Sequence, residues 1–342
     1  MTDIKSMYFD ELSASLKAFG LPAFRAKQVW QWLQQKGVSS FAEMTNLSKS
    51  LRDSLEKEYI IKSCEVEKKS VSALDGTVKY LFRLFDGEFI ESVLMKYKYG
   101  YSLCVSTQVG CRMNCAFCAT GVGGFIRNLS AAEILGQIHA AQNDMNIKVS
   151  HIVLMGMGEP MDNYDNVIRF LRLVNNDDGL NIGMRNISLS TCGIIPGIKK
   201  LQEENMQLTL SVSLHAPNDE IRSRLMPVNK KYKVDELLNA CKVYADSTSR
   251  RISYEYAMFG GVNDSDECAR ELAAKLKGTL AHINLIPAND VTESGLRSST
   301  PERIQRFCEI LEQAGRNVTV RRSLGGDIDA SCGQLRSKHI KA

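Results

Sequence analysis

The chain has 342 residues, of which 44% are apolar and 24% charged, and its 43 Lys and Arg against 39 Asp and Glu give a net charge of +4. At roughly 150 residues per domain, this length predicts about two structural units, and the composition excludes a disordered or fibrous chain. The mild basic excess permits an anionic partner without requiring one. The unusual feature is a set of 10 cysteines, several of which cluster between positions 104 and 118.

The cysteines and the N-terminus bear on the compartment. A secreted domain held by disulfides would be shorter and would spread its cysteines more evenly. The first residues carry charges where a secretory signal needs an apolar core, and no stretch approaches the roughly 18 to 20 apolar residues of a membrane span. We therefore expect a protein of the reducing cytoplasm, where clustered cysteines more often hold a metal than a disulfide.

The beginning of the chain predicts a small helical unit. Apolar residues recur at helical spacing, and Gly20 and Pro22 end the first helix. The predicted elements are helices at 8–19, 24–35 and 47–58, a charged joining stretch at 65–69, and strands at 78–85 and 89–95. We expect residues 1–85 to form an N-terminal helical accessory domain and residues 86–342 to form the core.

From about residue 100 onward, short apolar runs alternate with amphipathic helical patterns. The predicted strands are 102–107, 150–156, 186–191, 208–214, 252–258, 281–286 and 317–322. Ser130 and Asp264 each precede a glutamate by three positions and Thr300 precedes a proline, all signs of helix starts. This alternation predicts parallel strands with helices outside, as an open doubly wound sheet or as a full or partial (β/α) barrel. In each of these architectures the active site lies where the strands end.

Three cysteines form a compact motif directly after the strand predicted at 102–107. Cys111, Cys115 and Cys118 have the spacing C-x3-C-x2-C. Structural zinc needs four ligands in closed tetrahedral geometry, and no nearby histidine or cysteine supplies an obvious fourth. Three thiolates on one short loop suit a cubane iron–sulfur cluster with one iron left open for an exogenous ligand.

This motif resembles the signature of the radical S-adenosylmethionine (SAM) superfamily, in which the open iron binds the methionine moiety of SAM. The accompanying motifs are Ser-Thr-Gln-Val-Gly-Cys before the cluster, Gly-Met-Gly-Glu-Pro at 156–160, Ser-Leu-His at 213–215, Asn-Leu-Ile-Pro at 284–287 and Asp-Ile-Asp-Ala-Ser-Cys-Gly-Gln-Leu at 327–335. Together they resemble the RlmN/Cfr family of RNA adenine methyltransferases over nearly the whole chain. The resemblance implies a partial (β/α) barrel of the radical SAM type with a small helical domain in front.

The resemblance implies a radical route, because the C2 and C8 carbons of adenine are not nucleophilic enough to attack the methyl group of SAM. In the family picture, one SAM molecule methylates Cys332 by an ordinary displacement. A second is cleaved reductively at the [4Fe-4S] cluster, and the 5′-deoxyadenosyl radical takes a hydrogen atom from the methyl group on Cys332. The resulting carbon radical adds to adenine. Cys104 then breaks the protein–RNA link and forms a disulfide with Cys332, so two SAM molecules are used per methyl transferred.

Further residues receive roles from the same resemblance. Glu91 matches the family's proposed proton acceptor, and the sequence leaves open whether Glu91 or Cys104 removes the ring proton. The residues implied to bind SAM follow predicted strands and are Gly158, Glu159, Ser190, Ser213, Leu214, His215 and Asn289. Polar residues at strand ends also commonly cap the next helix, so each of them is a weak signal alone. Their shared placement at one face of the barrel favours a cofactor site.

The resemblance implies C2 methylation of an adenine in 23S rRNA and of the adenine beside the anticodon in tRNAs. Two alternatives stay open: Cfr-type methylation at C8 of the ribosomal adenine, and a non-catalytic RNA-binding protein that keeps the cluster as a structural element. The implied partners are 23S rRNA, tRNA and an electron donor such as flavodoxin or ferredoxin, with no membrane and a monomeric state. Residues 316–342 carry six Lys and Arg against two Asp, which favours contact with an RNA backbone near Cys332, while Lys338 and Lys341 equally suit a solvated tail. We expect the N-terminal domain, residues 1–85, to be a second RNA contact.

Overall fold

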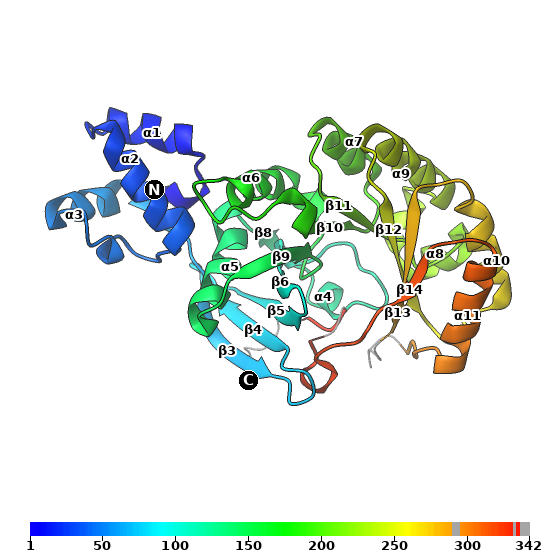
Figure 1. The fold of residues 1–342 in the computed structure, drawn as a ribbon. Helices are drawn as coiled ribbons and strands as arrows, with labels where there is room; N and C mark the ends of the chain where they lie inside the picture. The colour runs from blue at the N-terminus through cyan, green and yellow to red at the C-terminus, as the bar shows by residue number, and fades with distance from the viewer. Residues whose placement is uncertain (289–294, 331–332, 336–342) are drawn as a thin grey trace.

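The N-terminal unit is built by the predicted amphipathic helices. In a computed structural model of the chain, which describes residues 1–288, 295–330 and 333–335, it forms one end of the molecule (Figure 1). Its helices are α1 (Phe9–Ala18), α2 (Ala23–Trp30) and α3 (Lys49–Glu58), and α2 continues into a π-helical turn, Gln31–Lys36. A short parallel pair, β1 (Thr2–Asp3) with β2 (Tyr59–Ile60), closes the unit. Leu12, Leu16 and Trp30 form its buried side.

The largest sheet in the described part of the chain has ten strands in the order β14-β13-β12-β11-β10-β9-β6-β5-β4-β3. The parallel strands are β6 (Gly100–Cys104), β9 (Val149–Leu154), β10 (Ile187–Thr191), β11 (Thr209–Ser213), β12 (Ile252–Met258), β13 (Ala281–Pro287) and β14 (Val318–Val320). Their antiparallel neighbours are β3 (Glu65–Val71), β4 (Val78–Arg83) and β5 (Phe89–Tyr97). In the described strand order β14 and β3 are the two edges, so the curved sheet is an open, partial barrel and the predicted fold class is confirmed.

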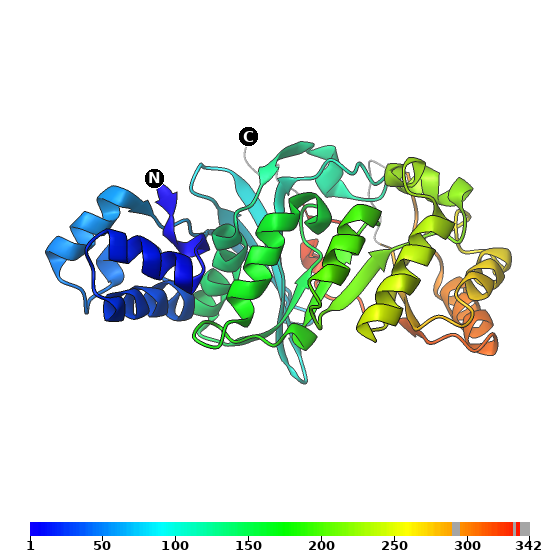
Figure 2. The ribbon, with the colours of Figure 1, turned by 90° about the horizontal axis from the view of Figure 1, so that it is seen from above.

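Helices cover the outer face of the parallel strands, as Figure 2 shows. They are α5 (Ala131–Met145), α6 (Tyr164–Asn175), α7 (Ile195–Glu203), α8 (Asp219–Leu225), α9 (Val234–Thr248), α10 (Asp266–Lys275) and α11 (Pro301–Gln313). The caps predicted at Ser130 and Thr300 are confirmed, because each side chain accepts a hydrogen bond from a backbone N–H in the first turn. Among the described helices, none is both long enough and apolar enough to cross a bilayer.

The helix start predicted at Asp264 is wrong by one position. Ser265 is the N-cap of α10, and its hydroxyl oxygen accepts the backbone N–H of Cys268 at 3.2 Å. The carboxylate of Asp264 instead accepts the backbone N–H of Gly261 and the hydroxyl of Ser299, both at 2.9 Å. Both residue types cap helices well, and the loop contacts decide between them.

The charged stretch at 65–69, which we expected to join the two units, is part of strand β3. Its side chains are mostly exposed, and its exposed lysines suit an edge strand of a sheet. Strands β3 and β4 fall inside the predicted unit 1–85 but pair with each other and, through β5, with the core sheet. Strand pairing alone does not locate the end of a domain, so the boundary at 85 stays a prediction.

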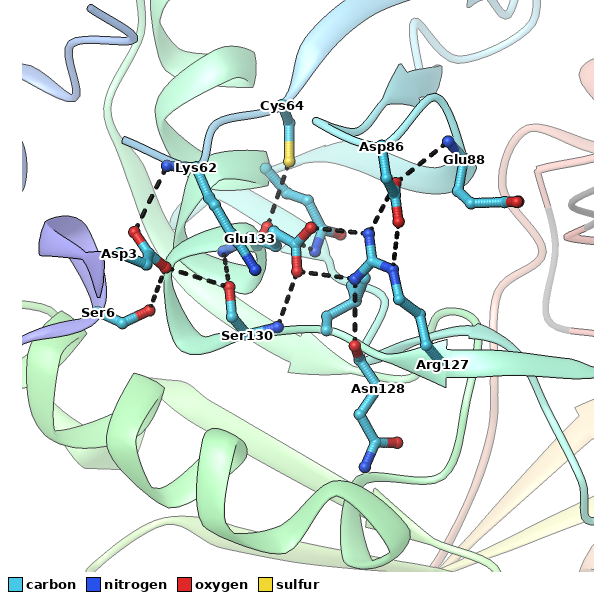
Figure 3. A network of polar contacts seen from close by, with 12 residues as sticks. Asp3, Ser6, Lys62, Cys64, Asp86, Glu88, Arg127, Asn128, Ser130 and Glu133 are labelled. Atoms are coloured by element: carbon cyan, nitrogen blue, oxygen red, sulfur yellow. Dashed lines mark hydrogen bonds and ion pairs between the residues drawn. The ribbon is translucent and has the colours of Figure 1, made fainter. Parts of the chain in front are cut away.

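A polar network joins the N-terminal unit to the core (Figure 3). Asp3 accepts a hydrogen bond from the hydroxyl of Ser130 at 3.4 Å. The buried carboxylate of Glu133 receives both terminal nitrogens of the Arg127 guanidinium at 2.9 Å, and the same guanidinium pairs with Asp86 at 2.6 Å. These acceptors raise the pKa of Arg127 above its usual value although burial opposes them. The start of α5 is therefore bonded to Asp3 of the N-terminal unit and, through Arg127, to Asp86 of the core.

Candidate cofactor cavity and catalytic residues

A cavity of about 170 Å³ lies where the parallel strands end. Since the carboxyl ends of parallel strands meet at the same edge of a sheet, residues that follow different strands converge there. Its lining includes the predicted residues Cys111, Cys115, Cys118, Gly158, Glu159, Ser190, Ser213 and His215. The structure therefore brings the cysteine motif and most of the strand-end residues together around one space.

The cysteine motif occupies the loop between β7 (Gln108–Gly110) and the short helix α4 (Ala119–Val122). Gly110 has φ of +74°, and a Cβ atom there would lie 1.9 Å from the carbonyl oxygen of Gly124, so only glycine fits. The backbone N–H of Ala116, in the middle of the motif, donates to the carbonyl of Leu225 at the end of α8 at 2.9 Å. The loop is thus held at its start by the turn at Gly110 and in its middle by the end of α8.

Burial controls the protonation of these thiols. It raises the pKa of Cys111 to about 12 and that of Cys115 well above its ordinary value. Both thiols hold their protons at neutral pH unless a cation replaces them. In the described part of the chain, no three His, Cys, Asp or Glu side chains stand close enough to bind a single metal ion. A cubane cluster offers each thiolate its own iron, and the three cysteines on one cavity wall fit that requirement.

Glu159 links the ends of two strands. Its carboxylate accepts the backbone N–H of Met161 at 3.0 Å and that of Cys192, after β10, at 2.7 Å. Burial raises the pKa of this carboxyl although these hydrogen bonds oppose the shift. A carboxylate has about four acceptor positions, so Glu159 can hold the loop and still accept a hydrogen bond from a ligand in the cavity.

The residues predicted after β11 do not all face the cavity. Ser213 and His215 line it, whereas Leu214 is fully buried in the core and does not. His215 has φ of +55°, and its Nδ1 accepts the backbone N–H of Ala257 at 2.9 Å. Burial lowers the pKa of His215 to about 3, so the imidazole is neutral with its proton on Nε2. Phe117 from the cysteine loop packs edge-on against this ring at 4.8 Å between centroids.

Cys104 lines a second cavity next to the first. The two share Met155, Ile286 and Arg321, so they adjoin. The second is bordered by Val93 on β5 and, from the end of the chain, by Arg322, Ser323, Leu324, Ala330 and Leu335. Cys104 therefore lies beside the cofactor cavity and under the C-terminal segment.

Glu91 lies on β5, and its side chain is 2% exposed. It does not line either of the two adjoining cavities, and its carboxylate forms an ion pair with Lys79 at 3.0 Å. Glu91 and Val93 are two residues apart on one strand and so share a face, and Val93 is the register partner of Cys104. The predicted proton acceptor thus faces the same side of the sheet as Cys104.

Two predicted residues, Cys332 and Asn289, lie outside the described residues. The neighbours of Cys332 border both cavities: Ala330 lines the second and Gly333 the first. The carbonyl of Gly333 accepts the backbone N–H of Ala119 at 2.7 Å, directly after the cysteine motif. The chain on both sides of Cys332 therefore runs along the cysteine loop and the Cys104 cavity.

Sequence reasoning missed two residues that line the cavity and a buried arginine that holds the neighbouring strand ends. Glu255 on β12 lines it, and the carboxylate accepts hydrogen bonds from Ser253 at 2.9 Å and Asn284 at 2.6 Å. Cys192, whose position carried no functional signal, also lines it. Arg222 on α8 is fully buried and donates to four acceptors: the carbonyls of Leu214, Cys192 and Ser213, and the side-chain oxygen of Asn229. A lone charge inside an apolar strand was the available signal for Glu255.

Comparison with known proteins agrees with this architecture. Residues 105–273 match the Radical SAM superfamily, and residues 2–61 match the ribosomal RNA large subunit methyltransferase N-terminal domain. The crystal structure of a radical SAM methyltransferase from Sphaerobacter thermophilus superposes with a TM-score of 0.94 at 42% identity, covering 99% of this chain and 100% of that one. A cysteine triad beside the open end of a partial barrel, in a chain with these similarities, defines a radical SAM enzyme.

Full-length relatives narrow this class. A probable dual-specificity RNA methyltransferase RlmN from Lachnoclostridium phytofermentans is 52% identical over 98% of this chain and 95% of its own length. Another from Clostridium novyi is 50% identical over 100% of this chain and 99% of its own length. The chain belongs to the RlmN family of radical SAM RNA methyltransferases, which confirms the resemblance found in the sequence. Membership in this class means that the enzyme uses a [4Fe-4S] cluster and SAM.

Proposed function

We propose that this methyltransferase modifies C2 of an adenine in 23S rRNA and of the adenine beside the anticodon in tRNAs. The observation that carries the proposal is full-length similarity, at about half identity, to proteins named dual-specificity RNA methyltransferases. The match of residues 2–61 to an N-terminal domain of ribosomal RNA large subunit methyltransferases supports the ribosomal substrate. The motif resemblance supplies adenine C2 as the site of modification.

In this proposal, Cys111, Cys115 and Cys118 hold the [4Fe-4S] cluster, and SAM binds across the adjoining strand ends. When bound, the two groups supply a methyl cation equivalent and, on reduction, a carbon-centred radical. Gly158 gives SAM close access to the backbone, because φ of +101° and contact with Gln108 leave no room for a side chain. Ser190 and Ser213 offer hydroxyl groups, and His215 offers the N–H of Nε2. Leu214 contributes only its backbone, and the chemistry of Asn289 suits a hydrogen-bonding role.

Three residues act on the RNA in the proposal. Cys332 carries the methyl group to the adenine carbon. Release of the product requires that the adduct loses the ring proton, its bond to the Cys332 sulfur and its unpaired electron, for which the cluster would be the acceptor. Glu91 accepts that proton, supported by its placement on the face that also carries Cys104. The thiolate of Cys104 attacks the sulfur of Cys332 and forms a disulfide. The pair of electrons of the broken S–C bond stays with the methylene carbon on the adenine, which takes up a proton and becomes the methyl group. A reductant of thiol type then restores both cysteines.

The RNA and the reductant approach from outside the cavities. Arg321 borders both cavities and Arg322 borders the second, so a phosphate backbone laid over this opening meets positive charge. We further propose that flavodoxin or ferredoxin reduces the cluster, that the chain works as a monomer, and that it acts in the cytoplasm, where rRNA and tRNA are found. Sedimentation analysis with and without RNA tests the monomeric state.

Mass mapping of adenosines in rRNA and tRNA from a strain that lacks the gene, with and without complementation by this chain, tests the proposal. We expect 2-methyladenosine to disappear from both RNAs and to return on complementation. Finding only 8-methyladenosine would overturn the proposed C2 position and favour the Cfr-type reaction. Finding no change in either RNA would favour a protein that binds RNA without modifying it.

A further inference from the structure

The turn between β3 and β4 holds the segment that leads to Cys332. The carboxylate of Asp327 accepts the hydroxyl of Ser72 at 2.7 Å and the backbone N–H of Ala73 at 2.9 Å. In the opposite direction, the carboxylate of Asp75 accepts the backbone N–H of Gly325 at 2.9 Å. Figure 1 shows the C-terminal segment, drawn red, running from β14 toward these strands. Contacts in both directions fix residues 325–327 on the hairpin.

Lys79, on β4 immediately after this turn, adds a contact nearer to Cys332. Its ammonium lies 3.0 Å from the Glu91 carboxylate and donates to the backbone carbonyl of Asp329 at 3.1 Å. The lysine side chain is only 11% exposed. In the sheet register Lys79 faces Val93, which in turn faces Cys104. One ammonium therefore joins the strand face that carries Glu91 and Cys104 to the segment that carries Cys332.

The conformation of Asp329 makes this contact informative. Asp329 has φ of +50°, a left-handed conformation that L residues other than Asn, Asp and Gly rarely adopt. The chain turns there, three residues before Cys332, and the Asp329 carbonyl is aimed at the lysine. Hydrogen bonds from a charged donor are about twice as strong as neutral ones. The Lys79 side chain is largely buried, whereas Asp329 lies at an exposed position.

We propose that Lys79 is a positioning residue for the methyl transfer: it aligns the Cys332 segment, through the Asp329 carbonyl, with Glu91 and Cys104. This inference rests on the proposed roles of those three residues. Lys79 touches neither SAM nor adenine in the proposal and acts through the groups it holds. An ammonium has three donors, so it can satisfy the carboxylate and the carbonyl together, whereas the thioether of methionine donates to neither.

The test uses the full-length protein and three variants. Lys79→Met keeps an unbranched side chain of similar length and removes its charge. Lys69→Met is the matched control, because Lys69 lies on the neighbouring strand β3 and pairs with Asp144 on α5 at 2.8 Å, away from the Cys332 segment. Ser72→Ala loosens the same segment from the turn side without touching Lys79, and so gives an answer if Lys79→Met does not fold.

Hydrogen exchange of the backbone amides in the peptide covering 325–335 is measured without RNA or SAM, so its result does not depend on the chemistry. We expect Lys79→Met to speed exchange in this peptide by about 10- to 100-fold, with Ser72→Ala having a smaller effect of the same kind. Exchange in β4 and β5 should stay unchanged. Equal exchange of the peptide in Lys79→Met, Lys69→Met and the unaltered chain would overturn the proposal.

Kinetics with an RNA hairpin substrate supply the second readout. A misplaced Cys332 should lower kcat by about 100-fold and leave KM for RNA unchanged, because Lys79 is not an RNA contact in the proposal. An unchanged kcat, or a rise in KM alone, would refute a positioning role. If the unaltered chain never methylates Cys332, the proposed function fails, while the exchange result still decides whether Lys79 holds the segment.

Discussion

The two halves of the main sheet use their strands in different ways. In the parallel half, from β9 to β12, the residues that border the cofactor cavity sit in or just after strand ends. In the other half, Lys79 on β4 and Glu91 on β5 share a strand face with Cys104 on β6, the strand at which the antiparallel and parallel parts of the sheet meet. A segment from the far end of the chain contacts Lys79 and borders the cavity that Cys104 lines. Topology alone brings the first group together, whereas the second depends on long-range contacts. Substitutions in the two halves should therefore affect different measured properties, RNA methylation in one half and the free energy of unfolding in the other.

The largest effect is expected from removing either cysteine of the proposed redox pair, Cys104 or Cys332. Cys332→Ala removes the proposed methyl carrier and should abolish RNA methylation. Cys104→Ala leaves the carrier but no thiol to release the product, so a covalent protein–RNA adduct should accumulate on a denaturing gel. Cys308→Ala, a buried cysteine on α11, is the control and should keep full activity. Repeated turnover by Cys104→Ala would contradict the division of labour proposed for the two cysteines.

The next effect probes the parallel half, where Arg222 holds the ends of β10 and β11. Arg222→Met leaves three buried carbonyls without their donor and should lower the free energy of unfolding by about 3–4 kcal/mol. Arg224→Met, at an exposed position on the same helix, should change it by less than about 0.5 kcal/mol. Urea unfolding of the cluster-free chains measures both. Equal stability of the two variants would show that Arg222 does not anchor the strand ends.

A third effect concerns Gly158 in the same half. Gly278→Ala, at φ of +73° with nothing near its Cβ position, should cost only the strain of a left-handed residue, about 1–2 kcal/mol. Gly158→Ala adds contact at 2.6 Å with Gln108 and should cost about 1–3 kcal/mol more. Urea unfolding of the pair isolates the close packing between the two strand-end loops. Equal urea midpoints of unfolding for Gly158→Ala and Gly278→Ala would contradict this close packing.

The smallest effect is a pH dependence from His215. Its pKa is about 3 in the folded chain and about 6.5 when unfolded, so below pH 6.5 the unfolded chain binds a proton that the folded chain does not. The contribution of His215 is therefore complete above pH 6.5 and is lost as the pH falls toward 3. Relative to His215→Asn, the unaltered chain should lose about 2 kcal/mol between pH 7 and pH 5.

The buried His139 titrates in the same direction but is present in both chains, so its contribution cancels in this comparison. Urea unfolding of the unaltered chain and of His215→Asn at pH 7 and pH 5 measures how much unfolding free energy each chain loses. A His215→Asn chain that loses as much stability as the unaltered chain would show that His215 is not held neutral by burial.

The parallel half was predictable because local patterns decide it. Alternating apolar residues over five to seven positions marked β10 and β12, and the cysteine spacing marked the loop that lines the cavity. The loop after each parallel strand lies at the active-site edge, whichever side chains it carries. Leu214 shows the limit, because the strand end places a residue near the cavity but does not decide which side chain turns inward.

The antiparallel half was harder to predict for physical reasons. Strand β3 is charged and exposed along most of its length, so it resembles a linker in sequence. Lys79 resembles an ordinary solvated side chain until its partners are known, and those partners are Glu91 on β5 and Asp329 near the end of the chain. The contact between Ser72 and Asp327 spans 255 positions and leaves no local pattern.

The central claim, that Cys332 carries the methyl group to RNA, is tested most directly by tandem mass spectrometry of the peptide containing Cys332. The protein is purified from iron-replete cells with its cluster intact. The account predicts a peptide heavier by one methylene unit, with the added mass on the cysteine sulfur. A Cys332 that is never methylated under these conditions, together with normal RNA methylation by Cys332→Ala, would contradict it.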